Sequence, residues 1–257
     1  MYRIGTTSYI VPDDLIANVR FLAGWVQDVE LILFELEDGS SNLPDAATLN
    51  ELKHLAEEHR LTYTVHLPLD LRLDERGGFN HPSLVQAQRV IECTRALQPW
   101  AYVAHLDRRD LPLTASQYEQ ARWEKQAARA LEQAAEWAGD PALLAVENLE
   151  GCPPEANLNV LERVPVSLCI DIGHLWLDGY DALSYLKAHL DRARVVHLHG
   201  VNKHDHTSLT HANPEALRQV LNCLKASERS IVLTLEVFNE PDLESSLAAL
   251  QSAKDEQ

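Results

Sequence analysis

Short runs of apolar and β-branched residues recur along the chain, and each is followed by a segment whose apolar positions repeat with the period of a helix. The strand-like runs are residues 3–8, 29–34, 61–66, 101–105, 143–147, 166–171, 194–199 and 231–236. The helix-like segments are residues 13–23, 45–59, 82–97, 115–137, 156–163, 181–189, 214–226 and 241–252. Because strands that are joined through helices pair in parallel, this alternation predicts a parallel sheet.

Eight strand–helix units in 257 residues are typical of a closed barrel. We therefore predict an α/β fold with a single (β/α)8 TIM barrel that spans residues 1–257 as one domain. The competing fold is an open doubly wound sheet, but the G-x-G-x-x-G turn expected after its first strand is missing. Asn213 before Pro214 and Asn239 before Pro241 are signals for the start of a helix.

The charge balance narrows the class of ligand. The chain has 22 Lys and Arg against 39 Asp and Glu, a formal net charge of −17 at pH 7. Proteins hold nucleic acid and anionic membranes mainly through Lys and Arg, so we expect neither partner. No apolar run approaches the roughly 18 residues of a spanning helix, and the first residues lack the pattern of a signal peptide. The cysteines form no C-x-x-C pair, so we expect reduced thiols and a cytoplasmic protein.

Nitrogen and carboxylate side chains stand at the ends of six consecutive strand-like runs. Active sites of (β/α)8 barrels lie at the C-terminal ends of the strands, so we expect these side chains to meet at the mouth of the barrel. Imidazole and carboxylate ligands without thiolate suit Zn²⁺, Mn²⁺ or Fe²⁺, and so large a set can hold more than one ion. The set comprises His66, His105, Glu147, Asn148, Asp171, His174, His197, His199 and Glu236, with His204, Asp205 and His206 in a following loop.

A histidine alone is weak evidence for a metal site. His54, His59 and His189 lie within helix-like segments, and for them a solvated side chain is the simpler interpretation. The carboxylates at the ends of the fifth, sixth and eighth runs are different, because buried together they would repel one another. A bound cation is the simplest way to offset that repulsion.

This set of residues resembles the xylose isomerase-like barrels, specifically the AP endonuclease family 2 grouping. That superfamily contains sugar isomerases and epimerases, which use one or two divalent ions, and phosphodiester hydrolases, which use up to three zinc ions. Common to both branches would be the ligand core Glu147, Asp171, His197 and Glu236. His66, His105 and the loop with His204 and His206 separate the branches, and their presence favours the hydrolases.

The resemblance implies two or three divalent ions, most often Zn²⁺ in the hydrolase branch. A first ion would bind His66, His105 and Glu147, and Glu147 would bridge it to a second ion on the four-residue core. A third ion would take His174, His206 and the residue two before it, which is His204 here and Asp in the endonucleases. Either His204 ligates, or Asp205 does after a small shift of the loop, or the third site is weak or empty.

A closer resemblance is carried by residues 5–10, 12–14, 18–23 and 29–35, which are similar to the cobamide-remodelling phosphodiesterases. It implies hydrolysis of the nucleotide loop of a corrinoid such as cobalamin or pseudo-B12. Glu147 or Glu236 would take a proton during the reaction, and a third ion, or protonated His174 or His206, would stabilise the leaving alkoxide. Substrate contacts are expected from residues near the strand ends, namely Tyr9, Arg72, Asn148, Trp176 and Lys203. The long connection at residues 67–81 is either a lid or a plain surface excursion.

Two other classes of function stay open. A divalent-metal-dependent sugar isomerase or epimerase would use the four-residue core and leave His66 and His105 to contact hydroxyl groups. A protein that only binds metal or corrinoid is the third interpretation, which so many ligands with open coordination positions disfavour.

Overall fold

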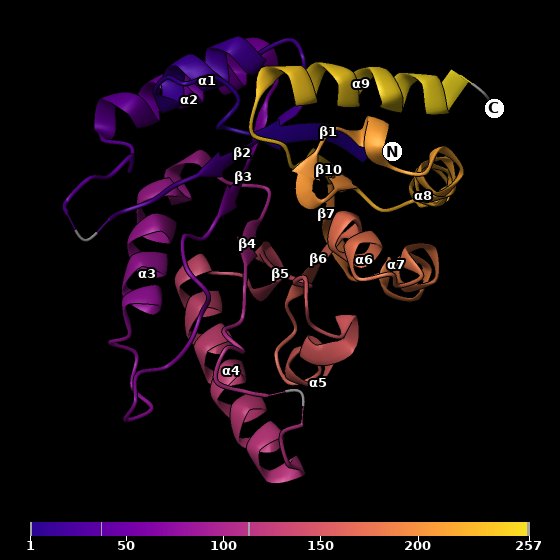
Figure 1. Cartoon of the computed structure of the whole chain (residues 1–257). Coiled ribbons are helices and arrows are strands. Elements are labelled where there is room, and N and C mark those ends of the chain that lie inside the picture. Colours follow the sequence, from indigo (N-terminus) through magenta and orange to yellow (C-terminus); the bar gives the residue numbers. More distant parts are fainter. Residues whose placement is uncertain (1, 37, 113, 256–257) are drawn as a thin grey trace.

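Eight parallel strands close into a barrel in the order β1-β10-β7-β6-β5-β4-β3-β2, and pairing of β2 with β1 completes the ring. The computed structural model describes residues 2–36, 38–112 and 114–255. Figure 1 shows the strands as an inner ring with the helices outside it. The predicted α/β barrel is confirmed. Its strands are β1 (Tyr2–Thr7), β2 (Asp28–Ile32), β3 (Thr62–His66), β4 (Tyr102–Ala104), β5 (Leu144–Glu147), β6 (Ser167–Asp171), β7 (Ala193–Leu198) and β10 (Ile231–Leu235).

The helices follow the strands in chain order. They are α1 (Leu15–Leu22), α2 (Ala46–His59), α3 (Pro82–Thr94), α4 (Gln117–Ala138), α5 (Leu158–Leu161), α6 (Ile172–Leu177), α7 (Ala182–His189), α8 (Pro214–Ala226) and α9 (Glu240–Asp255). The side chain of Asn213 accepts the backbone N–H of Ala216 at 3.0 Å and so caps α8. Asn239 accepts the N–H of Asp242 at 2.9 Å at the start of α9, which confirms both predicted start signals. No helix in the described part of the chain is both long and apolar enough to cross a membrane.

Three elements differ from the sequence prediction. The segment after β6 is the short helix α6, which is capped by the side chain of Asp171 through the backbone N–H of His174. The predicted loop after β7 is instead a two-stranded antiparallel hairpin of β8 (Gly200–Asn202) and β9 (His204–Thr207). The predicted helix at residues 156–163 is a 3-10 turn (Pro154–Asn157) followed by the brief α5. Each is too short to show a hydrophobic period of its own.

The interior of the barrel is built in layers. At the N-terminal end the Trp100 ring lies between the guanidinium groups of Arg3 and Arg194, each 4.2 Å from the ring centroid. Above the indole lies a layer of small buried side chains, which comprises Ala101, Val103, Ala145, Cys169 and Val195. The larger hydrophobic core packs between strands and helices. The C-terminal end of the interior is therefore left to the polar side chains predicted above.

Candidate metal centre

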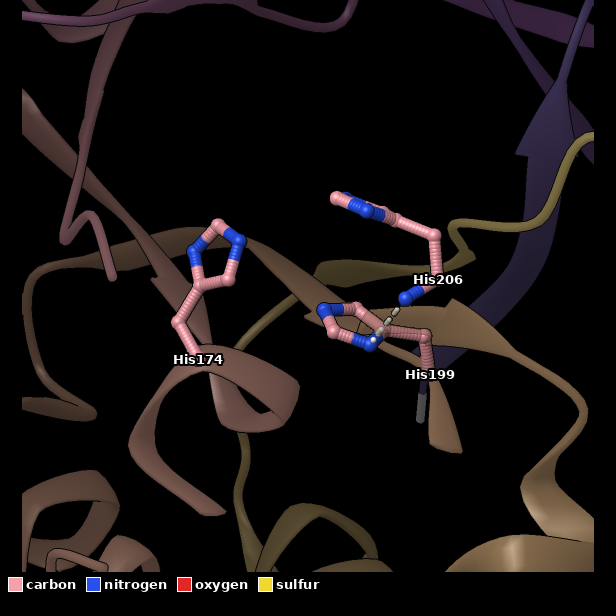
Figure 2. Close-up of side chains that lie close together, drawn as sticks. All are labelled: His174, His199 and His206. Atoms are coloured by element: carbon pink, nitrogen blue, oxygen red, sulfur yellow. Dashed lines mark hydrogen bonds between the residues drawn. The ribbon is translucent and has the colours of Figure 1, made fainter. Parts of the chain in front are cut away.

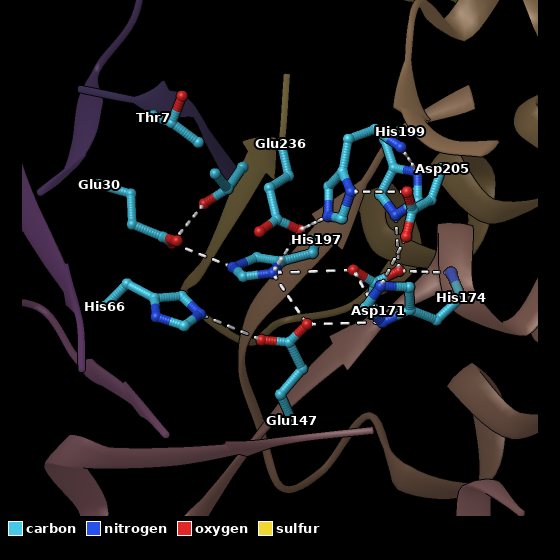
Figure 3. A network of polar contacts seen from close by, with 12 residues as sticks. Thr7, Glu30, His66, Glu147, Asp171, His174, His197, His199, Asp205 and Glu236 are labelled. Atoms are coloured by element: carbon cyan, nitrogen blue, oxygen red, sulfur yellow. Dashed lines mark hydrogen bonds and ion pairs between the residues drawn. The ribbon is translucent and has the colours of Figure 1, made fainter. Parts of the chain in front are cut away.

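The predicted ligands converge because side chains alternate between the two faces of each strand. His66, Glu147 and Asp171 are the last residues of β3, β5 and β6, and all three point into the barrel mouth in Figure 3. His197 on β7 lies directly opposite Asp171 in the strand register. Glu236 follows the last residue of β10. Strand ends far apart in the sequence thus bring their side chains to one place.

A first group consists of His66, His105 and Glu147, whose ligand atoms lie within 4.8 Å of one another. Oε2 of Glu147 is 3.1 Å from Nε2 of His105 and 3.6 Å from Nε2 of His66. Two ligand atoms on a tetrahedral zinc ion are about 3.4 Å apart, given zinc–ligand distances near 2.1 Å. The spacing of this group therefore fits a metal ion.

A second group comprises Glu147, Asp171, His197 and Glu236, again within 4.8 Å. Nδ1 of His197 lies 3.4 Å from Oε1 of Glu147, 3.8 Å from Oδ2 of Asp171 and 3.1 Å from Oε2 of Glu236. Glu147 thus turns Oε2 to the first group and Oε1 to the second. A single carboxylate stands between two sets of ligands, as the bridging role requires (Figure 3).

Several of these buried atoms lack a hydrogen-bond partner within the described residues. They include Oδ2 of Asp171, Nδ1 of His197 and Oε2 of Glu236. Buried polar atoms are normally paired, and an unpaired buried carboxylate oxygen is costly. The three atoms face one another without hydrogen-bond geometry, so a shared cation would satisfy all of them. The donor set fits divalent metal.

The first-group histidines are oriented by their other ring nitrogens. Nδ1 of His66 lies 2.9 Å from the carbonyl oxygen of Leu67, to which it can donate. Nδ1 of His105 lies 3.2 Å from Oδ1 of Asp70. A hydrogen bond from Nδ1–H leaves the lone pair on Nε2, the nitrogen that faces Glu147. Both rings therefore present the nitrogen that a metal needs.

The carboxylates and imidazoles of the first and second groups change one another's pKa values. Burial by itself raises the pKa of the Glu147 carboxyl, but the charges of His197 and His105 outweigh burial and hold that pKa well below its usual range. Burial likewise lowers the pKa of His105, but Glu147 and Asp70 outweigh it and raise the pKa to about 10. Imidazolium groups thus offset the carboxylates when no cation does so.

A third group brings together His174, His199 and His206, shown in Figure 2. The backbone N–H of His206 donates to Nδ1 of His199 at 3.0 Å. The same Nδ1 lies 3.1 Å from the carbonyl oxygen of Gly200, and Nε2 lies 3.3 Å from Oδ1 of Asp171 without a hydrogen bond in the described residues. A proton on Nδ1 would leave the lone pair on Nε2, and a proton on Nε2 would leave it on Nδ1, so these contacts fit either tautomer and His199 stays a candidate ligand.

Asp205 lies beside the third group, next to His174 and His206. Nδ1 of His174 lies 3.1 Å from the carbonyl oxygen of Asn148, which leaves Nε2 free as a ligand. Asp205 places Oδ2 at 3.9 Å from that Nε2 and Oδ1 at 3.1 Å from Nδ1 of His206. His204 is exposed, and its nearest polar contact is the carbonyl oxygen of Asp205. Of the three alternatives for this site, the structure brings Asp205 to the group and not His204.

The residues expected to contact the substrate differ in their exposure and in their polar partners. Tyr9 is exposed after β1, and Lys203 is exposed at the tip of the β8–β9 hairpin. Trp176 on α6 is half-buried against the core. Asn148 exchanges two hydrogen bonds with the backbone of Asp171, at 3.0 and 2.9 Å, and so positions that residue. Arg72 pairs with two carboxylates, Oδ2 of Asp107 at 3.2 Å and Oδ2 of Asp110 at 3.0 Å.

Two residues that contact the ligand groups were missed by sequence reasoning. Asp70 lies in the long connection after β3, where nothing in the sequence sets it apart. Glu30 stands inside an apolar run, and its signal was the alternation with Asp28 two residues before it, which places both carboxylates on the inner face of β2.

A closed (β/α)8 barrel with imidazole and carboxylate groups at its mouth defines a class of enzyme, the TIM-barrel enzymes of a superfamily whose members typically bind divalent metals. Within that class, the chain belongs to the family described as xylose isomerase-like TIM barrel, which matches residues 26–255. A comparison with curated proteins gives no match.

Solved structures share the fold over nearly the whole chain. A D-tagatose 3-epimerase-like protein has a TM-score of 0.76 at 18% identity, covering 98% of this chain and 97% of that one. Endonuclease IV from Thermus thermophilus has a TM-score of 0.70 at 18% identity, covering 99% and 100%. An L-ribulose 3-epimerase has a TM-score of 0.68 at 14% identity, covering 100% and 97%. At these identities the likeness concerns the fold alone.

Proposed function

We propose that the protein is a metal-dependent phosphodiester hydrolase that cleaves the nucleotide loop of a cobamide. The observation that carries the proposal is the position of Glu147, whose two carboxylate oxygens face two separate groups of ligands. A single-ion site has no need for the first group of His66 and His105. Two ligand groups that share one carboxylate are the arrangement expected of a two-metal hydrolase.

When bound, two divalent ions would supply an activated water and neutralise the charge that develops on phosphorus. The chain's own residues would hold the substrate and move the protons. Glu236 keeps Oε2 without a hydrogen bond in the described residues, so this oxygen is available to take a proton from the attacking water. Nε2 of His174 lies near Glu150 and Asp205, and a His174 ring protonated on both nitrogens would donate from Nε2 to a leaving oxygen.

Two observations support a cobamide as the substrate: the surface around the mouth of the barrel and the likeness of residues 5–35 to the cobamide-remodelling enzymes. Large apolar side chains are exposed on the loops that follow the strands, at Tyr9, Leu36, Leu69 and Phe238. An apolar rim suits a bulky amphipathic molecule such as a corrinoid. The net charge of −17 disfavours a nucleic acid as the phosphodiester.

A sugar epimerase is the second candidate, and the comparisons favour it over the hydrolase. Besides the two epimerases named above, several further sugar epimerases share the fold at similar TM-scores. The four-residue core of Glu147, Asp171, His197 and Glu236 would suffice for that chemistry with one ion. In this candidate His66 and His105 would contact substrate hydroxyl groups and would not bind metal.

The two candidates differ in the number of ions and in the substrate consumed. The protein loaded with Zn²⁺, Mn²⁺ or Fe²⁺ should be incubated with cobalamin and pseudo-B12 in adenosylated form, and chromatography should detect a corrinoid without its lower-ligand base. Ketohexoses and abasic DNA are run in parallel. Full metal occupancy with intact cobamides and interconverted ketose epimers would overturn the hydrolase in favour of the second candidate.

His105→Ala separates the candidates without knowledge of the substrate. As a metal ligand, His105 should be needed for full metal content, so the variant should lose metal and hydrolysis together. As a hydroxyl contact, it should leave metal content unchanged and raise KM for a sugar. His54→Ala, on the exposed side of α2, is a matched control that should change neither quantity.

A further inference from the structure

Glu30 is a fully buried carboxylate in the middle of β2, below the ligand groups. Its side chain points into the barrel and is 0% exposed. Oε2 of Glu30 lies 3.0 Å from Nε2 of His197 and also accepts the hydroxyl of Thr234 at 3.3 Å. Figure 3 shows Glu30 and the second ligand group on opposite sides of the His197 ring. A charged group this deep in a barrel needs a partner, and His197 is that partner.

The contact decides which nitrogen of His197 carries the proton. Nε2 faces a carboxylate oxygen and therefore donates, so a neutral ring has its lone pair on Nδ1. That lone pair faces three carboxylates, those of Glu147, Asp171 and Glu236, and Nδ1 has no hydrogen-bond partner in the described chain. A lone pair among three carboxylates is repulsive unless a cation lies between them. The tautomer that Glu30 selects is thus the one a metal requires.

We propose that Glu30 is a positioning residue of the metal centre: it accepts the Nε2 proton of His197, fixes the ring in its metal-binding tautomer and raises the basicity of Nδ1. Carboxylates that hold a metal-bound imidazole in this way commonly contribute 10- to 100-fold to metal affinity. The inference rests on the metal centre of the proposed function and not on the choice of substrate.

Glu30 also has a competing role as a ligand. One of its oxygens lies within 4.8 Å of ligand atoms of His66 and Glu236. Oε2 is already engaged by His197 and Thr234, and only Oε1 lacks a hydrogen bond. The two roles predict different results: a positioning residue changes how tightly the ions bind, whereas a ligand of a separate ion changes how many ions bind at saturation.

The test is Glu30→Gln, which keeps the shape of the side chain and removes its charge. Asp28→Asn is the matched control, because Asp28 is equally buried on the same strand and contacts Thr62 instead of a ligand histidine. Thr234→Val removes only the hydroxyl that steadies Glu30, and serves as the milder variant if Glu30→Gln folds poorly. Circular dichroism establishes that each variant is folded.

Three measurements are made on each variant. Chelator competition gives the dissociation constant for Zn²⁺, elemental analysis gives ions per chain at saturation, and the visible spectrum of the Co²⁺-substituted protein reports on the ligand field of His197. Nitrogen-15 NMR of the zinc-loaded protein labelled at histidine identifies the protonated nitrogen of the His197 ring.

We expect Glu30→Gln to bind Zn²⁺ 10- to 100-fold more weakly with an unchanged number of ions and a shifted Co²⁺ spectrum. Thr234→Val should weaken binding a few-fold, and Asp28→Asn should match the parent protein. A His197 ring protonated on Nδ1, fewer ions at saturation in Glu30→Gln, or unchanged affinity and spectrum in that variant would each overturn the proposal. None of these readouts depends on phosphodiester hydrolysis, so failure of the proposed substrate leaves the result interpretable.

Discussion

Binding of metal to the metal-free protein should release protons, and the number is set by the ligand histidines. The pKa of His105 is raised to about 10, because Glu147 and Asp70 outweigh the effect of burial. The pKa of His197 is also raised, with burial opposed by the neighbouring Cys169, Glu30, Glu236 and Glu147. Both rings are therefore protonated at pH 7 before metal binds, and both must lose a proton to ligate.

The number of protons released follows from the imidazole groups of His105 and His197. Each ion displaces one imidazole proton, so loading two ions should release about two protons per chain at pH 7 to 8. For the ion at His105, the logarithm of the binding constant should rise by about one per pH unit below about pH 9, and for the ion at His197 it should also rise with pH. For His105, with a pKa of about 10, competition from the proton at pH 7 weakens the first site by about 4 kcal/mol.

The assay is chelator competition with Zn²⁺ from pH 6 to 8.5, corrected for the chelator, together with an indicator dye in weak buffer that counts the protons released. His105→Gln should release one proton fewer and flatten the pH dependence of its own site. A binding constant that does not change across this range, with no protons released, would refute the reasoning that His105 and His197 are protonated before metal binds and lose a proton when they ligate.

Three other predictions concern separate parts of the molecule. Glu147→Ala should hold at most one ion by elemental analysis and lose turnover, while circular dichroism shows the fold retained; near-normal activity would contradict a bridging role. Gly173→Ala presses a new Cβ against the His199 ring, so calorimetry should show a loss of about 1–3 kcal/mol from overpacking, and an unchanged melting temperature would speak against that contact. The pKa of Asp28 is raised to about 7, mainly by burial, so the parent protein loses stability as pH rises from about 4, the pKa of Asp in an unfolded chain, to about 7. The free energy of unfolding of Asp28→Asn, measured in urea relative to the parent protein, should therefore be about 3 kcal/mol more favourable at pH 8 than at pH 5. The same difference at both pH values would contradict this prediction.

The strands, and the grouping of most candidate ligands, could be predicted because two simple regularities coincide. A parallel barrel gathers the C-terminal ends of its strands, and the strand period sends alternate residues inward, so His66, Glu147 and Asp171 could be placed together from the sequence. Glu30 obeys the same period. It escapes prediction because one carboxylate inside an apolar run is easily assigned to the strand and not to the site.

The hairpin after β7 could not be predicted in the same way. Lys203 and His206 adopt left-handed backbone conformations, with φ of 57° and 52°. These turns interrupt the alternation of side chains, so Asp205 and His206 both face His174 while His204 faces solvent. The spacing of residues along the chain does not indicate where the backbone turns in this way. Few residues other than glycine adopt the left-handed conformation.

Trp100 and its two flanking guanidinium groups cover the end of the barrel interior opposite the metal centre, with a layer of small apolar side chains above them. Ions, water, substrate and product would all have to share the mouth at the other end. A product that lingers there also keeps out the next substrate, so release and not bond cleavage can set the rate in such a barrel. The loops that carry Tyr9 and Leu36 around this opening would then govern how fast the protein works, although neither supplies a candidate ligand.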